Sequence, residues 1–265
     1  MSMIINSYSF GGYTARTTAF LAATGITDTT IANALNTMDL ALIANGLDTK
    51  MKALYPFVGG TATTHKFNFM NPADTDAAFR LTFAGGWTHS ATGAKPNGTT
   101  GYADTHIIPT TNLSLNNTHA SYYSRTIDSG SKTFLGASTN AFLNRIVVLP
   151  KFGDGNYYSD HYQYTTSRIA YANTSTDAFF LDNRETSTSH TAYRNLVLKS
   201  TNVGVAGSMP NVGIYLGATN EVGVASSFGA YECALSSIGD GLTPTNASDF
   251  YTLVQNLQIA LARNI

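Results

Sequence analysis

Short hydrophobic runs alternate with polar turns along most of the chain, and this pattern predicts a protein built mainly of β-strands. The runs are rich in Thr, Val, Tyr and Phe and recur at about 8 to 12 residues, the spacing of sandwiches and barrels. They cover residues 66–70, 79–83, 101–107, 119–125, 132–137, 142–149, 156–164, 167–172, 178–182, 191–199, 212–218 and 228–238. Because no fixed period repeats, propellers and solenoids are not expected.

The last fifty residues predict how the sheet region closes. A strand over 212–218 and another over 231–238 precede the loop Gly239-Asp-Gly-Leu-Thr-Pro. A helix then begins at Thr243, with Pro244 in its first position, where proline is favoured. Its apolar residues share one face and should pack on the sandwich; they are Phe250, Leu253, Val254, Leu257 and Leu261.

Helical spacing appears only near the N-terminus, where residues 27–56 predict a small helical hairpin. Thr27 or Asp28 can cap the first helix, and Gly46 can end it. Its inward face is expected to consist of Ile31, Leu35, Met38, Leu42 and Ile43. A second short helix is predicted over residues 48–54. The chain therefore divides into an arm (1–26), the hairpin (27–56) and a sandwich with its closing helix (57–265).

The N-terminal arm is too apolar for a disordered tail and too short for a core. We expect it to lie either on its own body or on a neighbouring subunit. The candidate assembly residues are Ile4, Ile5, Tyr8, Phe10 and Tyr13.

The amino-acid composition of the chain argues against some classes of function. Charged residues make up 12% of the 265 residues and the net charge is -1, which provides no field for collecting phosphates and argues against nucleic-acid binding. The 37 Thr and 22 Asn instead indicate a neutral surface of hydroxyls and amides. No run is long and apolar enough for membrane insertion, and residues 1–6 lack the basic start of a secretory signal. Synthesis in a cytoplasm is therefore expected.

Three groups of stretches resemble a family of uncharacterised structural proteins of tailed bacteriophages. They are residues 54–60 with 67–81 and 85–89, residues 98–105 with 121–125, and residues 214–220 with 238–243. The last group also resembles the end of concanavalin A-like or laminin G-like jelly rolls, in which a strand precedes an "IG-x-GL" loop and a short helix. The resemblance covers roughly residues 27 to 265.

This resemblance implies a jelly-roll virion protein of the capsid-decorating, head-fibre or tail-fibre type. Such a protein would be made in the host cytoplasm and would assemble through its arm and sheet surfaces with copies of itself or with other virion proteins. The alternative is a glycan-binding, receptor-recognition module of the virion. A glycan-active enzyme is a further alternative, but it rests on fold analogy alone.

Aromatic side chains supply the candidate glycan site. Trp87, the only tryptophan, could stack on a sugar together with His89, although a Trp packed in the core is the alternative. The second group of candidates is Tyr157, Tyr158 and Tyr162, in a Tyr-rich strand.

The sequence offers little support for catalysis or for a resident cofactor. Its three glutamates, Glu185, Glu221 and Glu232, stand apart, so the paired carboxylates of a glycosidase are not evident and no enzyme is predicted. Asp154, Asn156 and Asp160 could bind calcium if a loop curled around them, but a tight turn feeding a strand explains the same residues. The six histidines show no metal-ligand spacing, and the single Cys233 is expected to be a buried thiol.

Overall fold

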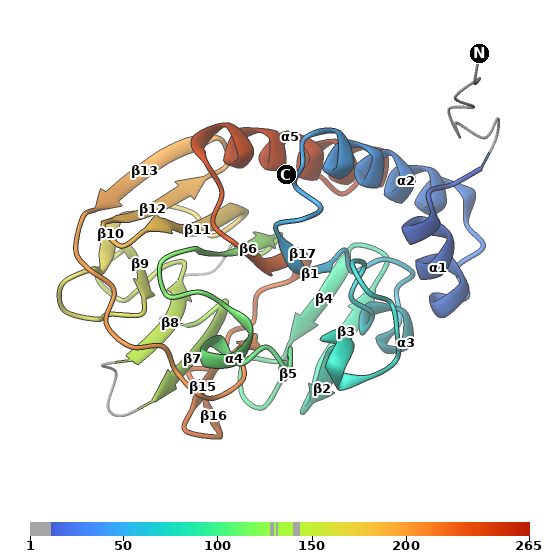
Figure 1. Ribbon diagram of the computed structural model, residues 1–265. Helices are drawn as coiled ribbons and strands as arrows, with labels where there is room; N and C mark the ends of the chain where they lie inside the picture. Colours follow the sequence, from blue (N-terminus) through green and yellow to red (C-terminus); the bar gives the residue numbers. More distant parts are fainter. Residues whose placement is uncertain (1–11, 128–129, 131, 140–143) are drawn as a thin grey trace, which may run out of the picture.

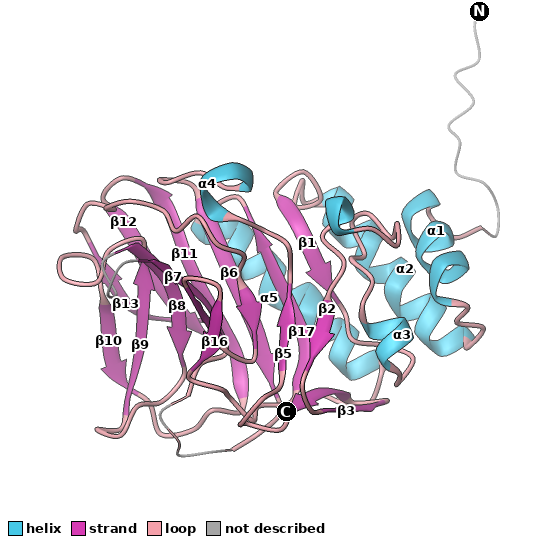
Figure 2. Cartoon of the chain, turned by 90° about the horizontal axis from the view of Figure 1, so that it is seen from below, coloured by secondary structure: helices cyan, strands magenta, loops and turns pink. Residues whose placement is uncertain are grey.

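The computed structural model describes residues 12–127, 130, 132–139 and 144–265. Its strands form two mainly antiparallel sheets, and the long helices lie along the outer face of one of them (Figure 1, Figure 2). The predicted mainly-β jelly-roll sandwich is confirmed. Among the described residues, none of the helices combines the length and the apolar character that crossing a bilayer requires.

Within the described residues one sheet has eight strands and the other nine. The eight-stranded sheet runs β13 (Val197–Asn202), β12 (Ser189–Arg194), β11 (Ala178–Thr186), β6 (Thr118–Ser124), β17 (Cys233–Gly239), β4 (Gly93–Pro96) and β3 (Trp87–Ser90), and β1 (Met51–Tyr55) also pairs with β17. The nine-stranded sheet runs β10 (Ile169–Ala172), β9 (Asn156–His161), β8 (Asn144–Leu149), β7 (Leu135–Thr139), β14 (Tyr215–Leu216), β5 (Tyr102–Asp104) and β2 (Thr82–Ala84). The hairpin of β15 (Thr219–Glu221) and β16 (Val224–Ser226) joins it through β7.

The space between the sheets is filled by aromatic rings. Phe134 lies at its centre, with the Tyr122 ring stacked on it at a centroid distance of 4.3 Å and Phe180 and Tyr231 at 5.1 and 4.8 Å. Cys233 lies in the same core, where burial raises the pKa of its thiol, so the predicted buried thiol is confirmed.

A second core lies between the eight-stranded sheet and the helices α1 (Ala15–Thr24), α2 (Thr29–Ala44) and α5 (Pro244–Ala260). Helix α5 begins as predicted, since the Thr243 hydroxyl accepts a hydrogen bond from the Asn246 N–H at 3.1 Å and Pro244 occupies the first turn. Phe250 on this helix is fully buried, and the burial of its side chain contributes about 2 kcal/mol to folding. The remaining helices are short: α3 (Ala62–His65), α4 (Pro109–Asn112) and the 3₁₀ turn Asp76–Ala78.

The predicted helical hairpin is half right. Helix α2 begins and ends as predicted, with Asp28 as its N-cap and Gly46 in the left-handed region at φ 63° just past its end. Ile43 is wrong as an inward residue, because it follows the buried Leu42 by about 100° around the helix and is 49% exposed. The second helix over residues 48–54 is wrong, because Met51–Tyr55 form strand β1 beside β17. The backbone groups of this short apolar run are satisfied by a sheet partner nearly 190 residues away, which local periodicity cannot reveal.

The arm is also corrected in part. Residues 15–24 form helix α1, whose Phe20 is fully buried against Phe69, and the Arg16 guanidinium pairs with the buried Asp39 of α2. This segment therefore lies on its own body. Of the assembly candidates, Tyr13 donates a hydrogen bond to Asn33 at 3.2 Å, whereas Ile4, Ile5, Tyr8 and Phe10 lie outside the described residues.

Candidate functional site

A hollow of about 360 Å³ lies on the outer face of the nine-stranded sheet. Successive side chains of a strand point to opposite faces, so Ile146 and Val148 of β8 enter the core while Arg145, Val147 and Leu149 face outward and line the hollow. Its other walls come from the β8–β9 turn, the loop after β9 and the β15–β16 hairpin; they include Phe152, Tyr158, Tyr164, Arg168, Thr219 and Glu221.

The floor of this hollow is built on one buried carboxylate. Asp160 is fully buried and accepts hydrogen bonds from two guanidinium groups. Arg168 binds it in a bidentate manner, Nε to Oδ1 and Nη2 to Oδ2, both at 2.8 Å, and Arg145 Nε reaches Oδ2 at 2.6 Å. Burial lowers the pKa of Arg145. Burial is also the largest effect on Arg168 and opposes its charge, but the hydrogen bonds and the negative charge of Asp160 together raise the pKa of Arg168. A bidentate fork fixes the direction of the Arg168 side chain.

Aromatic rings hold Arg168 in place. Its guanidinium carbon lies 4.1 Å from the centroid of the Tyr164 ring and 4.8 Å from that of Tyr158. Phe152 packs edge-on against Tyr158 at 5.9 Å. Phe152 and Tyr164 remain 46% and 39% exposed, so their rings present apolar surface to the solvent at the mouth of the hollow.

The opposite side of the hollow carries an acceptor. Glu221, at the end of β15, lines the hollow and takes part in no ion pair within the part of the chain that the structure describes. Between the two sides, the hydroxyls of Thr133 and Thr219 lie 3.1 Å apart. The hollow therefore offers guanidinium donors on one side, a carboxylate acceptor on the other, and apolar rings at its rim.

Of the three predicted tyrosines, one lines the hollow and two do not. Tyr158 lines the hollow, and its hydroxyl donates to Asp154 Oδ2 at 2.6 Å. Tyr157 and Tyr162 were wrong as ligand-binding residues, because both are fully buried. Tyr157 points the other way along β9 and stacks between Tyr171 and Phe180 in the core.

Trp87 and His89 lie on β3 and do not line the hollow. The Trp87 indole N–H donates to the carbonyls of Ala84 and Tyr102, and its ring packs against Phe83 and His89. The Trp87 side chain is half-buried and packs against the core, which agrees with the alternative interpretation of a tryptophan packed in the core.

His89 belongs to a pair of histidines whose protons are fixed by their surroundings. The Gly60 N–H donates to His65 Nε2 at 3.2 Å, so His65 Nδ1 carries the proton and donates to His89 Nδ1 at 2.9 Å. Burial, with His89 close by, lowers the pKa of His65 to about 3. Both rings are therefore neutral at physiological pH.

The predicted calcium ligands do not form a site. Both oxygens of Asp160 are engaged by guanidinium groups, so a cation would have to displace two positive charges. Asp154 instead caps the tight turn before β9, where it accepts from the Asn156 N–H at 2.9 Å. The tight-turn interpretation explains these residues.

His161, Asp182 and His190 form a buried cluster between the sheets that sequence reasoning missed. Asp182 accepts from His161 Nδ1 at 2.9 Å and from His190 Nε2 at 2.6 Å, and all three residues are fully buried. Burial lowers the pKa of His161 to about 4, while the two histidines hold the pKa of Asp182 far below its usual range against the effect of burial. His190 Nδ1 also lies 2.5 Å from the Ser167 carbonyl, whereas His161 Nε2 is buried without a hydrogen-bond partner among the described residues.

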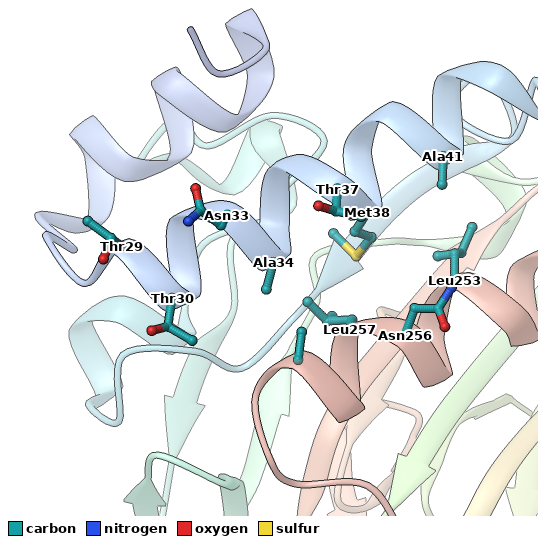
Figure 3. A pocket seen from close by; sticks show the side chains of 11 residues that line it. Thr29, Thr30, Asn33, Ala34, Thr37, Met38, Ala41, Leu253, Asn256 and Leu257 are labelled. Carbon is teal, nitrogen blue, oxygen red and sulfur yellow. The ribbon is translucent and has the colours of Figure 1, made fainter. Parts of the chain in front are cut away.

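A separate groove of about 340 Å³ runs between α2 and α5 (Figure 3). Its walls are mostly small or apolar, with Ala34, Met38 and Ala41 on α2 facing Leu253 and Leu257 on α5. It contains no charged side chain. The polar and aromatic groups that could orient a small ligand gather instead in the hollow on the nine-stranded sheet.

Comparison with known proteins supports the fold. No protein-family model and no curated protein matches the chain. Among solved structures, domain 4 of AbnA, a GH43 extracellular arabinanase from Geobacillus stearothermophilus in complex with arabinotriose, is similar with a TM-score of 0.51 and 14% identity over 76% of this chain and 98% of that domain.

Two other structures are similar over part of their length. The binding domain of Paraclostridial Mosquitocidal Protein 1 has a TM-score of 0.51 and 10% identity over 77% of this chain and 52% of that one. A mutant of Trypanosoma rangeli sialidase displaying trans-sialidase activity has a TM-score of 0.50 and 8% identity over 83% of this chain and 39% of that one. At these identities the likeness is one of fold alone, a mainly-β jelly-roll sandwich.

Proposed function

We propose that the chain is a glycan-binding module that holds a saccharide in the hollow on the nine-stranded sheet. The observation that carries the proposal is the convergence of Arg168, Tyr164, Phe152 and Glu221 around one cavity. Sugar rings present apolar C–H faces and a rim of hydroxyls, and a site with aromatic faces and a few placed polar groups complements both.

The size and the rigidity of the hollow support this proposal. Its volume of about 360 Å³ falls within the range of small-molecule sites and has room for one or two sugar rings. Arg168 is fixed by Asp160 and two tyrosine rings before any ligand arrives, which lowers the entropy lost on binding. The AbnA domain, which is similar in fold, was solved with a bound trisaccharide.

Binding without hydrolysis fits the same residues. A glycosidase requires two carboxyl groups on either side of the scissile bond. Among the described residues, Glu221 is the one carboxylate that lines the hollow, and Asp160 beneath the floor is held by both arginines. We therefore propose a binding role and keep the absence of enzyme activity as a prediction.

The virion setting is a second proposal, which comes from the resemblance and from the apolar N-terminal residues. A virion fibre or decoration protein can both assemble and bind a surface glycan, so the two roles are compatible. Assembly with copies of itself would be measured as a change in oligomer size after deletion of residues 1–11, and an unchanged size would count against assembly through this segment.

Tyr164→Ala tests the glycan site. We expect this variant to bind saccharides from a glycan array at least tenfold more weakly than the unaltered protein. The nearest analogue, a nucleic-acid base stacked on an aromatic ring, is worth about 1–3 kcal/mol, and about 1.4 kcal/mol corresponds to a tenfold change in affinity. Tyr13→Ala is the matched control, since Tyr13 is 38% exposed and Tyr164 39%. If neither variant alters binding, or if no glycan on the array binds, the proposal is wrong.

A further inference from the structure

We infer that the saccharide held in the hollow carries a carboxylate, and that Arg168 receives it. This inference rests on the proposed function and specifies its ligand class. It follows from three features of the hollow: the charges on its floor, the free edge of Arg168, and the position of Glu221.

Two guanidinium groups meet at one carboxylate at the floor of the hollow. Arg145 and Arg168 both pair with Asp160, so two permanent positive charges share one buried carboxylate. The Arg145 side chain is 8% exposed and that of Arg168 is 25% exposed, so Arg168 is the one that reaches solvent. A partly desolvated guanidinium attracts an anionic group more strongly than a hydrated surface lysine does.

The geometry of Arg168 leaves one side of its fork for a ligand. Nε and Nη2 donate to Asp160, and Nη1 belongs to the remaining edge. Tyr158 and Tyr164 restrict rotation of the guanidinium plane, so the direction of this edge is set before binding. A planar carboxylate on a sugar ring fits such an edge because it accepts charge-assisted hydrogen bonds in the plane of the guanidinium.

Glu221 sets the orientation of the ligand. The Glu221 carboxylate and Arg168 both line the hollow, so an anionic group placed near Glu221 would be repelled and one placed near Arg168 attracted. Sugar hydroxyls can donate to Glu221 while the acid lies on Arg168. An acidic saccharide, such as a uronic or nonulosonic acid, complements both ends of the hollow, whereas a neutral sugar complements the Glu221 end alone.

The experiment compares acidic glycans with their neutral counterparts on the full chain. Each uronic or nonulosonic acid glycan is titrated beside the same glycan with the acid reduced to an alcohol. We expect at least tenfold tighter binding of the acidic member at low salt. We also expect this preference to shrink as the salt concentration rises, because partly exposed charges are screened.

Three variants locate the effect. Arg168→Gln should weaken binding of the acidic member at least tenfold and binding of the neutral member less, so that most of the preference for the acidic member is lost. Lys95→Gln, which removes one positive charge from an exposed position on β4, should leave the preference unchanged. Glu221→Gln should tighten acidic glycans and weaken neutral ones. The Lys95 variant thus controls for net charge, and a thermal melt of each variant confirms that it is folded.

The outcomes separate this inference from the proposed function. If neutral glycans bind as tightly as acidic ones, the inference is wrong and the glycan site stands. If sulfated glycans bind more tightly than carboxylated ones, the assignment of a carboxylate is wrong. If no saccharide binds, both fall.

Discussion

Two buried aspartates, one on each sheet, show how the same local design leads to different properties. Asp160 on β9 lies behind the hollow and is paired with two arginines, while Asp182 on β11 lies in the core and is paired with two histidines. Both carboxylates are fully buried. Guanidinium groups stay charged at every accessible pH, whereas imidazoles titrate in the physiological range. The arginine pair is thus suited to holding a constant charge beside a ligand, and the histidine pair to stabilising the core within a range of pH.

The largest expected effect is on the Asp182 side of the comparison. Asp182→Asn removes a buried negative charge next to two histidines and near Arg184, a fully buried guanidinium. Leaving the Arg184 charge uncompensated and the N–H groups of His161 and His190 without their carboxylate acceptor should lower the free energy of unfolding by about 3–5 kcal/mol. Urea denaturation followed by tyrosine fluorescence measures the loss.

Asp160→Asn gives the other side of the same comparison. We expect a smaller loss, about 2 kcal/mol, because the Arg168 side chain is 25% exposed and can turn toward water. Asp76→Asn is the control, since its side chain is 58% exposed and its replacement should change stability by less than about 0.5 kcal/mol. Equal losses for the Asp160 and Asp182 variants would contradict the distinction between the two clusters.

We expect a fall in pH to reduce the stability contributed by the histidine cluster around Asp182 before it affects the arginine cluster around Asp160. The folded-state pKa of His161 is about 4 because of burial, below its ordinary value of 6.5, so the unfolded chain takes up a proton that the folded chain refuses. The stability that His161 contributes is complete above pH 6.5 and is lost as the pH falls toward 4, by about 1.4 kcal/mol for each pH unit. His119, whose pKa burial lowers to about 4, adds a loss of the same sign.

Nuclear magnetic resonance of the histidine ring protons can follow these groups one by one. We expect the His161 and His119 signals to keep their neutral positions until the pH approaches 4 or the protein unfolds. Titration of His161 near its ordinary 6.5 in the folded protein would show that burial does not control it. The guanidinium groups around Asp160 keep their charge throughout this pH range, so the Asp160 cluster serves as the comparison that does not titrate.

The sequence was informative where local chemistry decides the structure. The caps Asp28 and Thr243 and the Pro244 at the first turn placed α2 and α5, because hydrogen bonds at helix ends involve neighbours in the sequence. It was misleading where a distant partner decides. The single strand predicted over 191–199 is a hairpin of β12 and β13 that turns at Asn195, whose φ of 55° periodicity does not reveal.

The candidate site was found only in part for the same reason. Tyr157 and Tyr158 are adjacent, and their roles depend on which face of β9 is buried; a shift of one residue exchanges them. Arg145, Asp160 and Arg168 lie 15 and 8 residues apart and meet only because β8, β9 and β10 are adjacent in the sheet. One signal was available, since an arginine inside the apolar run Asn144-Arg-Ile-Val-Val-Leu has to find a partner when it is buried.

The smallest expected effect tests whether the arginine cluster depends on geometry or on charge alone. Arg168→Lys keeps the positive charge beside Asp160 but replaces the bidentate fork and the stacking on Tyr164 with a single ammonium group. We expect a loss of stability of about 1 kcal/mol or less, discounted because this side chain is partly exposed, and a loss of most of the binding to acidic glycans. Denaturation and glycan titration of the same preparation measure both. Unchanged binding in this variant would mean that a positive charge at this position is enough and that the bidentate geometry has no role. The arginine cluster would then differ from the histidine cluster only in the pKa of its cationic groups.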